Sequence, residues 1–180
     1  NVVSGVLKLS TQKSDGREQI LGLAYPSDFL GRPFGEVSPY SVEALSESIV
    51  CVFQRSDFER FAEEHGRLEH KLLERTLGEL DRTRRWMLLL GRMNAEEKLA
   101  TLLLEIASRT VLATCENTGW KVPDEFELPM SRQQIADILG LTIETVSRQF
   151  TKFREEGVIE MRGRRDVTIR KRDALEMLAA

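Results

Sequence analysis

Residues 67–90 constrain the fold more than any other part of the sequence, because apolar and threonine side chains recur there in alternating steps of three and four. These positions, called here the heptad seam, are Leu73, Thr76, Leu80, Thr83, Met87 and Leu90. The spacing predicts one long α-helix. Its seam either packs on the chain's own core or joins two copies, and the length and strict spacing favour a coiled coil between two subunits. The two threonines should weaken that dimer.

The segment before this helix is predicted to be β-structure. Residues 2–9 are rich in β-branched side chains, Asp15-Gly16 is typical of a tight hairpin turn, and residues 49–53 return to strand character. Several short strands separated by turn residues indicate a small barrel or roll. Because the chain opens directly on a strand, we expect this roll to be incomplete at its start.

Two further helices are predicted, one on each side of the long helix. Ser56 is followed three residues later by Glu59, which is typical of a capping box at the start of a helix over 56–64. Gly91 is expected to end the long helix. The apolar spacing after it predicts another amphipathic helix over 95–110.

The chain is therefore expected to have an α+β fold in three units. These units are a β-roll over residues 1–64, a dimerisation helix over 65–91 and a C-terminal module over 92–180, with a polar linker over 114–127. The net charge is −3, yet residues 131–180 carry 10 Lys and Arg against 8 Asp and Glu. A mildly basic end on an acidic body is compatible with a local nucleic-acid surface, although so small an excess does not establish one.

Cysteine usage and hydropathy indicate a cytoplasmic protein. The two cysteines, Cys51 and Cys115, are too few for a disulfide framework. No apolar run approaches the ~18 residues that span a bilayer, and no signal peptide opens the chain. We therefore expect no membrane partner.

Residues 131–157 carry the strongest local signal. Ser131 with Gln134 predicts a capping box at the start of one helix, and Thr142 is a suitable cap for a second helix that Gly157 ends. Three small or apolar side chains stand at the spacing of a helix-turn-helix: Ala136, Gly140 and Val146. One core position, Gln149, is commonly apolar in such motifs, and we expect a following phenylalanine, Phe150 or Phe153, to compensate.

A helix-turn-helix places the N-terminal half of its second helix in the DNA major groove. Glu144, Ser147 and Arg148 share one face there. Arginine binds guanine O6 and N7 with two hydrogen bonds, worth ~1–3 kcal/mol of discrimination, and glutamate accepts from cytosine N4. Alternatively, Glu144 stabilises the helix dipole and Arg148 pairs with it on the surface. A carboxylate among phosphates is unfavourable unless it contacts a base, which favours the functional interpretation.

Residues 158–169 predict a β-hairpin with a basic tip, which is the wing of a winged helix. Its arginines, Arg162, Arg164 and Arg165, either touch phosphates or belong to an ordinary solvated turn. The full set of expected phosphate contacts is Ser131, Arg132, Thr142, Thr145 and Arg164.

In this order, these residues resemble the CRP/FNR family of bacterial regulators over essentially the whole chain. Residues 88–100 are similar to the stretch that joins the family's dimerisation helix to its DNA-binding domain, and 139–148 to the recognition helix of the FNR/FixK branch. The resemblance implies a transcription activator that binds an inverted repeat of TTGAT-type half-sites as a homodimer. It also implies that Glu144, Ser147 and Arg148 contact the bases, and that RNA polymerase is a partner.

The resemblance further implies that the N-terminal β-roll is of the cyclic-nucleotide-binding type. Family members that bind nucleotides have a Gly-Glu pair followed by an arginine that clamps the cyclic phosphate. Here Gly35-Glu36 is present, but residues 37–41 contain no arginine. Because a phosphate without a cationic partner is poorly held, we expect no cyclic nucleotide.

Cys51 leaves two interpretations open. Residues 44–51 resemble the segment that carries one iron–sulfur ligand in oxygen-sensing members, but a [4Fe–4S] cluster needs four ligands and this chain has no N-terminal cysteine group. A small buried hydrophobic side chain on a strand fits Cys51 better. FixK-type members resemble this arrangement, which implies an effector-independent activator without cofactor, tied to low-oxygen or nitrogen-fixation genes. The alternative is an FNR-type oxygen sensor whose cysteine cluster is missing here.

Other functional classes have little support in the sequence. His65 and His70 lie on or near the charged helix without a nucleophile or metal partner at a meaningful spacing, so neither an enzyme nor a metal site is expected. A pure interaction module with a degenerate DNA surface is the remaining class. The last residues, 178–180, resemble the tails bound by Clp-type proteases, although a frayed helix end is the simpler explanation.

Overall fold

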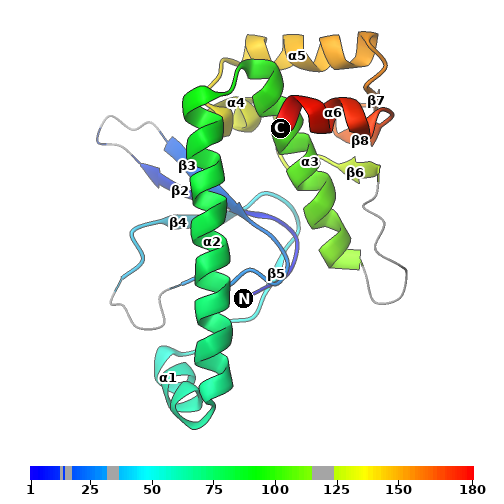
Figure 1. The fold of residues 1–180 in the computed structure, drawn as a ribbon. Coiled ribbons are helices and arrows are strands. Elements are labelled where there is room, and N and C mark those ends of the chain that lie inside the picture. Colours follow the sequence, from blue (N-terminus) through cyan, green and yellow to red (C-terminus); the bar gives the residue numbers. More distant parts are fainter. Residues whose placement is uncertain (13, 15–17, 32–36, 115–123) are drawn as a thin grey trace.

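The computed structural model describes the 180-residue chain except residues 13, 15–17, 32–36 and 115–123. The expected Asp15-Gly16 turn, the Gly35-Glu36 pair and Cys115 therefore lie outside the described residues. Figure 1 shows the N-terminal strands beside one long helix, with the C-terminal elements gathered at one end of that helix.

Five short strands are described in the N-terminal part. They are β1 (Val2–Ser4), β2 (Leu7–Gln12), β3 (Glu18–Ala24), β4 (Ser41–Ala44) and β5 (Ile49–Val50). Strand β2 lies between β3 and β4 and is antiparallel to both, while β1 pairs antiparallel with β5. The predicted β-roll is confirmed, although its last strand is shorter than expected, because residues 51–53 follow β5 exposed and without regular structure.

Both helices that follow differ in their ends from the prediction. Helix α1 (Arg55–Glu64) has Gln54 at its N-cap without a side-chain hydrogen bond, so the predicted capping box at Ser56 is wrong. Helix α2 (Gly66–Arg92) continues through Gly91 and ends at Arg92, with Met93 as its C-cap. One glycine in a helix costs only about 1 kcal/mol, which packing of the helix offsets.

The turn into the next helix, α3 (Ala95–Thr114), is fixed by Asn94. The Asn94 side-chain oxygen accepts the N–H groups of Glu96 at 2.9 Å and Glu97 at 3.1 Å, and the Glu97 carboxylate accepts the Asn94 N–H at 2.8 Å. These bonds satisfy amides that a helix start leaves without partners. Helix α3 therefore leaves α2 at a defined residue.

The C-terminal module combines α3 with further helices and a small sheet. Its elements after α3 are β6 (Glu125–Glu127), α4 (Arg132–Leu139), α5 (Ile143–Glu155), β7 (Ile159–Arg162), β8 (Asp166–Ile169) and α6 (Arg172–Ala179). The sheet has the order β6-β8-β7 and is antiparallel. Strand β6 lies in the predicted linker, where Phe126 is buried between two exposed glutamates.

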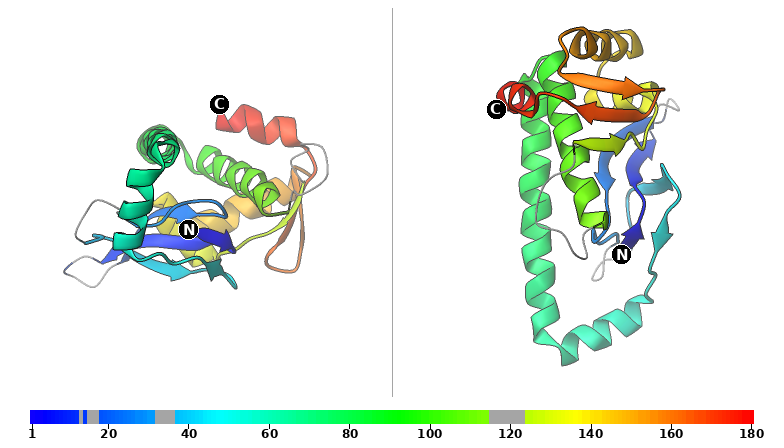
Figure 2. Two further views of the ribbon diagram at one scale, coloured as in Figure 1. Left: turned by 90° about the horizontal axis from the view of Figure 1, so that it is seen from below. Right: turned by 90° about the vertical axis from the view of Figure 1, so that its right-hand side faces the viewer.

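One continuous cluster of buried side chains joins the roll to the C-terminal module. It includes Ile20, Leu23 and Tyr25 of the roll, Leu89 of α2 and the apolar face of α3. The right-hand view of Figure 2 shows the strands and α3 on the same side of α2, and α4 contacts β3. The C-terminal module is therefore attached to the roll by direct packing contacts as well as by the connection through α2. Within the described residues, no helix is long and apolar enough to cross a membrane.

Candidate nucleic-acid interface

The first helix of the two-helix motif begins at the predicted capping box. The Gln134 N–H donates to Ser131 Oγ at 3.3 Å, and the Ser131 N–H donates to Gln134 Oε1 at 2.8 Å. The two bonds satisfy amides that α4 itself leaves without partners. Helix α4 therefore starts at a fixed point, immediately after Ser131.

Gly140 makes the turn between the two helices. Its φ of 62° and ψ of 41° lie in the left-handed region that favours glycine. The Leu141 N–H donates to the Ala136 carbonyl at 2.9 Å, and the buried Lys98 ammonium of α3 donates to the Leu139 carbonyl at 3.2 Å. Lys98 thus places a cation where the α4 dipole is negative. The sequence pattern gave no sign of this contact, because its partners are 41 residues apart.

The two helices pack through the side chains that the motif requires. Ala136 and Val146 are fully buried between them. Gln149 is only partly buried, and its side-chain oxygen has no hydrogen-bond partner in the part of the chain that the structure describes. Phe150 and Phe153 are both buried and supply the apolar contact that Gln149 lacks.

The outer face of the first turns of α5 is open to solvent. Thr142 caps the helix, its hydroxyl accepting the Thr145 N–H at 3.2 Å. Glu144, Ser147 and Arg148 are all exposed, and Arg148 Nη2 donates to the Thr145 hydroxyl at 3.4 Å. Figure 1 places α5 at the end of the molecule opposite α1, so a large partner can reach this face.

This face carries side chains of opposite charge, Glu144 and Arg148. Hydrogen bonds from its own backbone N–H and from Thr142 lower the pKa of Glu144, so its carboxylate is ionised at neutral pH. Arg148 brings a guanidinium with five N–H donors. The face therefore offers an acceptor and a fork of donors one helical turn apart.

Arg132, one of the expected phosphate contacts, has its side chain against the core of the module. Its guanidinium carbon lies 3.1 Å from the centroid of the Phe150 ring, and Nη2 donates to the Met161 sulfur at 3.0 Å. Burial lowers the pKa of Arg132 to about 10. The favourable contact between a cation and an aromatic face draws this side chain inward.

The wing forms as predicted, as the hairpin of β7 and β8. Gly163 at its tip has a φ of 70°, which places the neighbouring arginines at the turn. Arg162 and Arg165 lie 3.9 Å from Glu160 and Glu127, at the outer limit of an ion pair, and all three wing arginines are exposed. Such surface pairs contribute little, so the arginines can exchange them for other anions.

The heptad seam lies on the exposed side of α2. All six of its side chains are exposed, while Leu89 is buried and Trp86 partly buried against the core. The seam therefore does not pack on the chain's own core. Leu77 and Leu88 are also exposed and were not predicted, although Leu77 stands four residues after Leu73 and three before Leu80 and follows the same spacing.

Cys51 is exposed, which corrects the expectation of a buried hydrophobic side chain. Across the described residues, no group of three or more His, Cys, Asp or Glu side chains is placed to hold a metal ion. One thiolate cannot hold a cluster that needs four ligands. The described residues therefore do not fit a [4Fe–4S] cluster.

Both halves of the chain match known domain families. Residues 1–65 match the cyclic nucleotide-binding domain, and residues 97–178 match the Crp-like helix-turn-helix domain. The chain has the fold of FixK2 from Bradyrhizobium japonicum, with a TM-score of 0.87 and 36% identity over 100% of this chain and 86% of that one.

Curated relatives agree with this likeness. A probable transcriptional activator of Rhizobium leguminosarum bv. viciae is 46% identical over 99% of this chain and 72% of its own length. The transcriptional activator protein FnrL of Cereibacter sphaeroides is 45% identical over 94% of this chain and 67% of its own. The nitrogen fixation regulation protein FixK of Bradyrhizobium diazoefficiens is 45% identical over 88% of this chain, which spans 65% of that relative. The chain belongs to the CRP/FNR family of DNA-binding transcription regulators.

Proposed function

We propose that this chain activates transcription by binding, as a homodimer, an inverted repeat of TTGAT-type half-sites. The observation that carries the proposal is the position of Glu144, Ser147 and Arg148. All three are exposed on the first turns of α5, at an accessible end of the molecule. The N-terminal half of the second helix is the part that a helix-turn-helix places in the major groove.

The chemistry of these side chains suits the proposed half-site. Arg148 donates two hydrogen bonds to O6 and N7 of the guanine, and Glu144 accepts from the amino group of a cytosine. Ser147 can donate or accept. The remaining polar groups at the two helix starts, Ser131, Thr142 and Thr145, are proposed phosphate contacts together with Arg164 of the wing.

Dimerisation is proposed to use the heptad seam. Its six exposed side chains form the stripe that a parallel coiled coil buries, and the exposed Leu77 and Leu88 extend it. We accordingly propose three functional units: a roll over 1–64, a dimerisation helix over 65–91 and a DNA-binding domain over 92–180.

We propose that the protein works without cofactor or small effector, in genes of low-oxygen metabolism or nitrogen fixation. The similarity to FixK proteins supports the link to these genes. Among the described residues, Cys51 is a single exposed thiol, which is fewer than the four ligands that a [4Fe–4S] cluster needs. The competing iron–sulfur sensor predicts visible absorption from anaerobically purified protein. A colourless, operator-binding protein is the expected result.

RNA polymerase is the proposed target of activation, and residues 178–180 are the proposed ligand of a Clp-type protease. Leu178 packs in part against the core at the end of α6. Protease binding would therefore need the last turn of α6 to unfold. Equal lifetimes in a cell extract with and without residues 178–180 would dismiss the protease.

The proposed function is tested by titrating the protein against a TTGAT inverted repeat and a scrambled duplex of the same length. We expect specific binding to be ~10³-fold tighter or more than binding to the scrambled duplex. Equal affinity for both duplexes would instead favour an interaction module that does not recognise sequence.

A further inference from the structure

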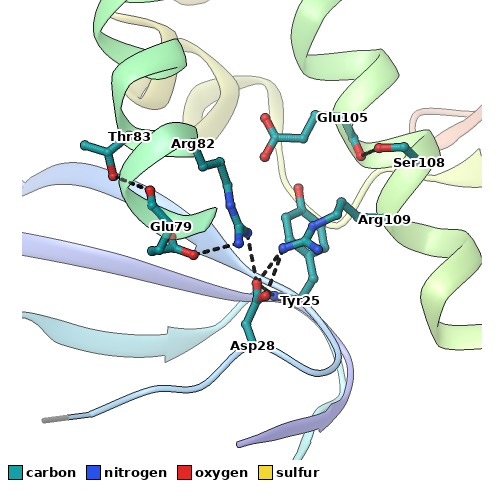
Figure 3. Close-up of polar contacts among 8 residues, drawn as sticks. All are labelled: Tyr25, Asp28, Glu79, Arg82, Thr83, Glu105, Ser108 and Arg109. Atoms are coloured by element: carbon teal, nitrogen blue, oxygen red, sulfur yellow. Dashed lines mark hydrogen bonds and ion pairs between the residues drawn. The ribbon is translucent and has the colours of Figure 1, made fainter. Parts of the chain in front are cut away.

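Asp28 joins three parts of the molecule at one buried point (Figure 3). It follows β3 in the roll, and its side chain is 9% exposed. Nη2 of Arg109, on α3, lies 2.9 Å from both carboxylate oxygens, and Nη1 of Arg82, on α2, lies 3.2 Å from Oδ2. Asp28, Arg82 and Arg109 are called here the Asp28 cluster.

The turn that carries Asp28 is held rigidly by the roll. The Asp28 N–H donates to the Tyr25 carbonyl at 3.0 Å, and the Tyr25 N–H donates to Asp28 Oδ2 at 2.9 Å. Ser27 has a φ of 73°, a conformation that a non-glycine residue keeps only when its surroundings impose it. Val2 of β1 imposes it through two backbone bonds, to Asp28 at 3.0 Å and from Ser27 at 2.9 Å.

The two arginines are held as firmly as the carboxylate. Arg109 lies over the Tyr25 ring, 5.1 Å from its centroid, and Arg82 also pairs with Glu79 at 2.6 Å. Both arginine side chains are less than a fifth exposed. Salt screens such shielded pairs weakly, and separating them leaves charges without partners in a low-dielectric site. The Asp28 cluster therefore resists opening.

We propose that Asp28 is a positioning residue for operator binding, an inference that rests on the proposed function. By holding Arg109, it fixes the direction of α3 relative to α2 and the roll. Helix α3 carries the motif with it, because Lys152 of α5 pairs with Glu96 and Lys98 holds the end of α4. In a dimer joined along α2, the angle between α2 and α3 sets the distance between the two recognition helices.

The fixed angle between α2 and α3 has a measurable consequence for DNA binding. Half-sites must lie about one helical turn apart, or a multiple of it, for two recognition helices to enter the groove on one face. A fixed angle between α2 and α3 restricts binding to one spacing of the half-sites. A loose angle lets the dimer accept several spacings but lowers its affinity for the best one.

The test uses Asp28→Asn, which keeps the size of the side chain and removes its charge. Dissociation constants of the full chain are measured on the preferred repeat, on repeats with the half-sites one base pair closer or farther apart, and on a single half-site. We expect affinity for the preferred repeat to fall about tenfold and the preference over shifted repeats to fall severalfold. Affinity for the single half-site should stay at the wild-type value.

Two further variants keep the test decisive. Arg109→Gln separates the roll from α3 while leaving the Asp28–Arg82 pair, so it replaces Asp28→Asn if that variant does not fold. The double variant should lose no more spacing preference than Asp28→Asn alone, because that variant already removes the contact with Arg109. Asp57→Asn, which removes an exposed carboxylate paired with Arg60 on α1, should bind like the wild type.

Wild-type spacing preference in both Asp28→Asn and Arg109→Gln would overturn the positioning role. Tighter operator binding by either variant would overturn it too, since the cluster would then restrain the motif instead of aligning it. Equal losses on single and paired half-sites would overturn it as well, because the cluster would then affect folding and not the spacing of the recognition helices. A wild-type protein that binds scrambled DNA as tightly as the repeat would instead refute the proposed function.

Discussion

Glu105 of α3 lies beside the Asp28 cluster and is partly buried (Figure 3). Burial raises the pKa of this carboxyl, and it outweighs the opposing effects of Arg82, Arg109, Arg85 and a hydrogen bond from Trp86. The folded chain therefore binds a proton at Glu105 more tightly than the unfolded chain does. The stability linked to Glu105 is present below its ordinary pKa of 4.5 and is lost as pH rises through the raised value.

Glu105→Gln should remove this loss, because glutamine is neutral at every pH. We expect the Tm of the variant, relative to that of the wild type, to be higher at neutral pH than at a pH near 4.5. Thermal unfolding of both proteins at the two pH values measures the difference. If the Tm of the variant relative to that of the wild type is instead lower at neutral pH than near pH 4.5, the ionised carboxylate is a net stabilising partner of the arginines.

Arg164 and Arg132 should differ in how they affect the salt dependence of operator binding. Arg164 is exposed at the wing, whereas Arg132 lies against Phe150 and Met161. Each lost phosphate contact reduces the slope of log K against log salt by ~0.9. We expect that reduction from Arg164→Ala and an unchanged slope from Arg132→Met. Equal reductions would show that Arg132 leaves the ring to meet a phosphate.

Single residues were predictable where their partners are close in sequence. The pairs Ser131 with Gln134 and Thr142 with Thr145 follow from local helix chemistry and were found in place. Asp28 gave no signal, because its partner on α3 lies 81 residues away. The contact of Arg132 with the Phe150 ring also gave no signal, because that ring belongs to another helix.

At the scale of the element, the start of α4 offers a test that separates folding from binding. Aspartate is as good an N-cap as serine, and its charge suits the positive end of the helix. Ser131→Asp should therefore keep or slightly raise the Tm while its charge repels DNA phosphates, weakening operator binding by ~1 kcal/mol. As a control, Ser56→Asp adds the same charge to α1, at the end of the molecule opposite α5, and should bind the operator with wild-type affinity. Wild-type affinity in Ser131→Asp would place Ser131 away from the phosphates.

The heptad seam can be tested with a matched pair of exposed methionines. Met87 of the seam is 69% exposed and Met177 of α6 is 77% exposed. A charge in a coiled-coil seam is strongly unfavourable because the dimer would bury it. We expect Met87→Glu to be monomeric in sedimentation at concentrations where the wild type is a dimer, and Met177→Glu to remain dimeric. A dimeric Met87→Glu would exclude the seam as the interface.

Elements were predictable where one periodicity runs through a long segment. The long helix and the helix-turn-helix were found with ends within a few residues of the prediction. The end at Gly91 was wrong, because one glycine costs a helix only about 1 kcal/mol and does not by itself end it. Strand β6 was missed, because its three residues form a strand only by pairing with the distant β8.

At the scale of the whole molecule, the arrangement of the parts could not be read from the sequence. Each part carries its own pattern, but their relative positions depend on contacts between distant residues. One is the core cluster that runs from Ile20 to Leu175, and another is the Asp28 cluster. Through these contacts the roll, α2 and the C-terminal module pack against one another, and α5 lies at an accessible end of the molecule.

The most direct test of the proposed DNA recognition measures Arg148→Ala against operators in which the guanine of each half-site is replaced by the other bases. The wild type should prefer guanine by ~1–3 kcal/mol per half-site. The variant should bind the original operator more weakly by a similar amount and should no longer distinguish the base at that position. An Arg148→Ala protein that binds with wild-type affinity and still selects guanine would contradict the account.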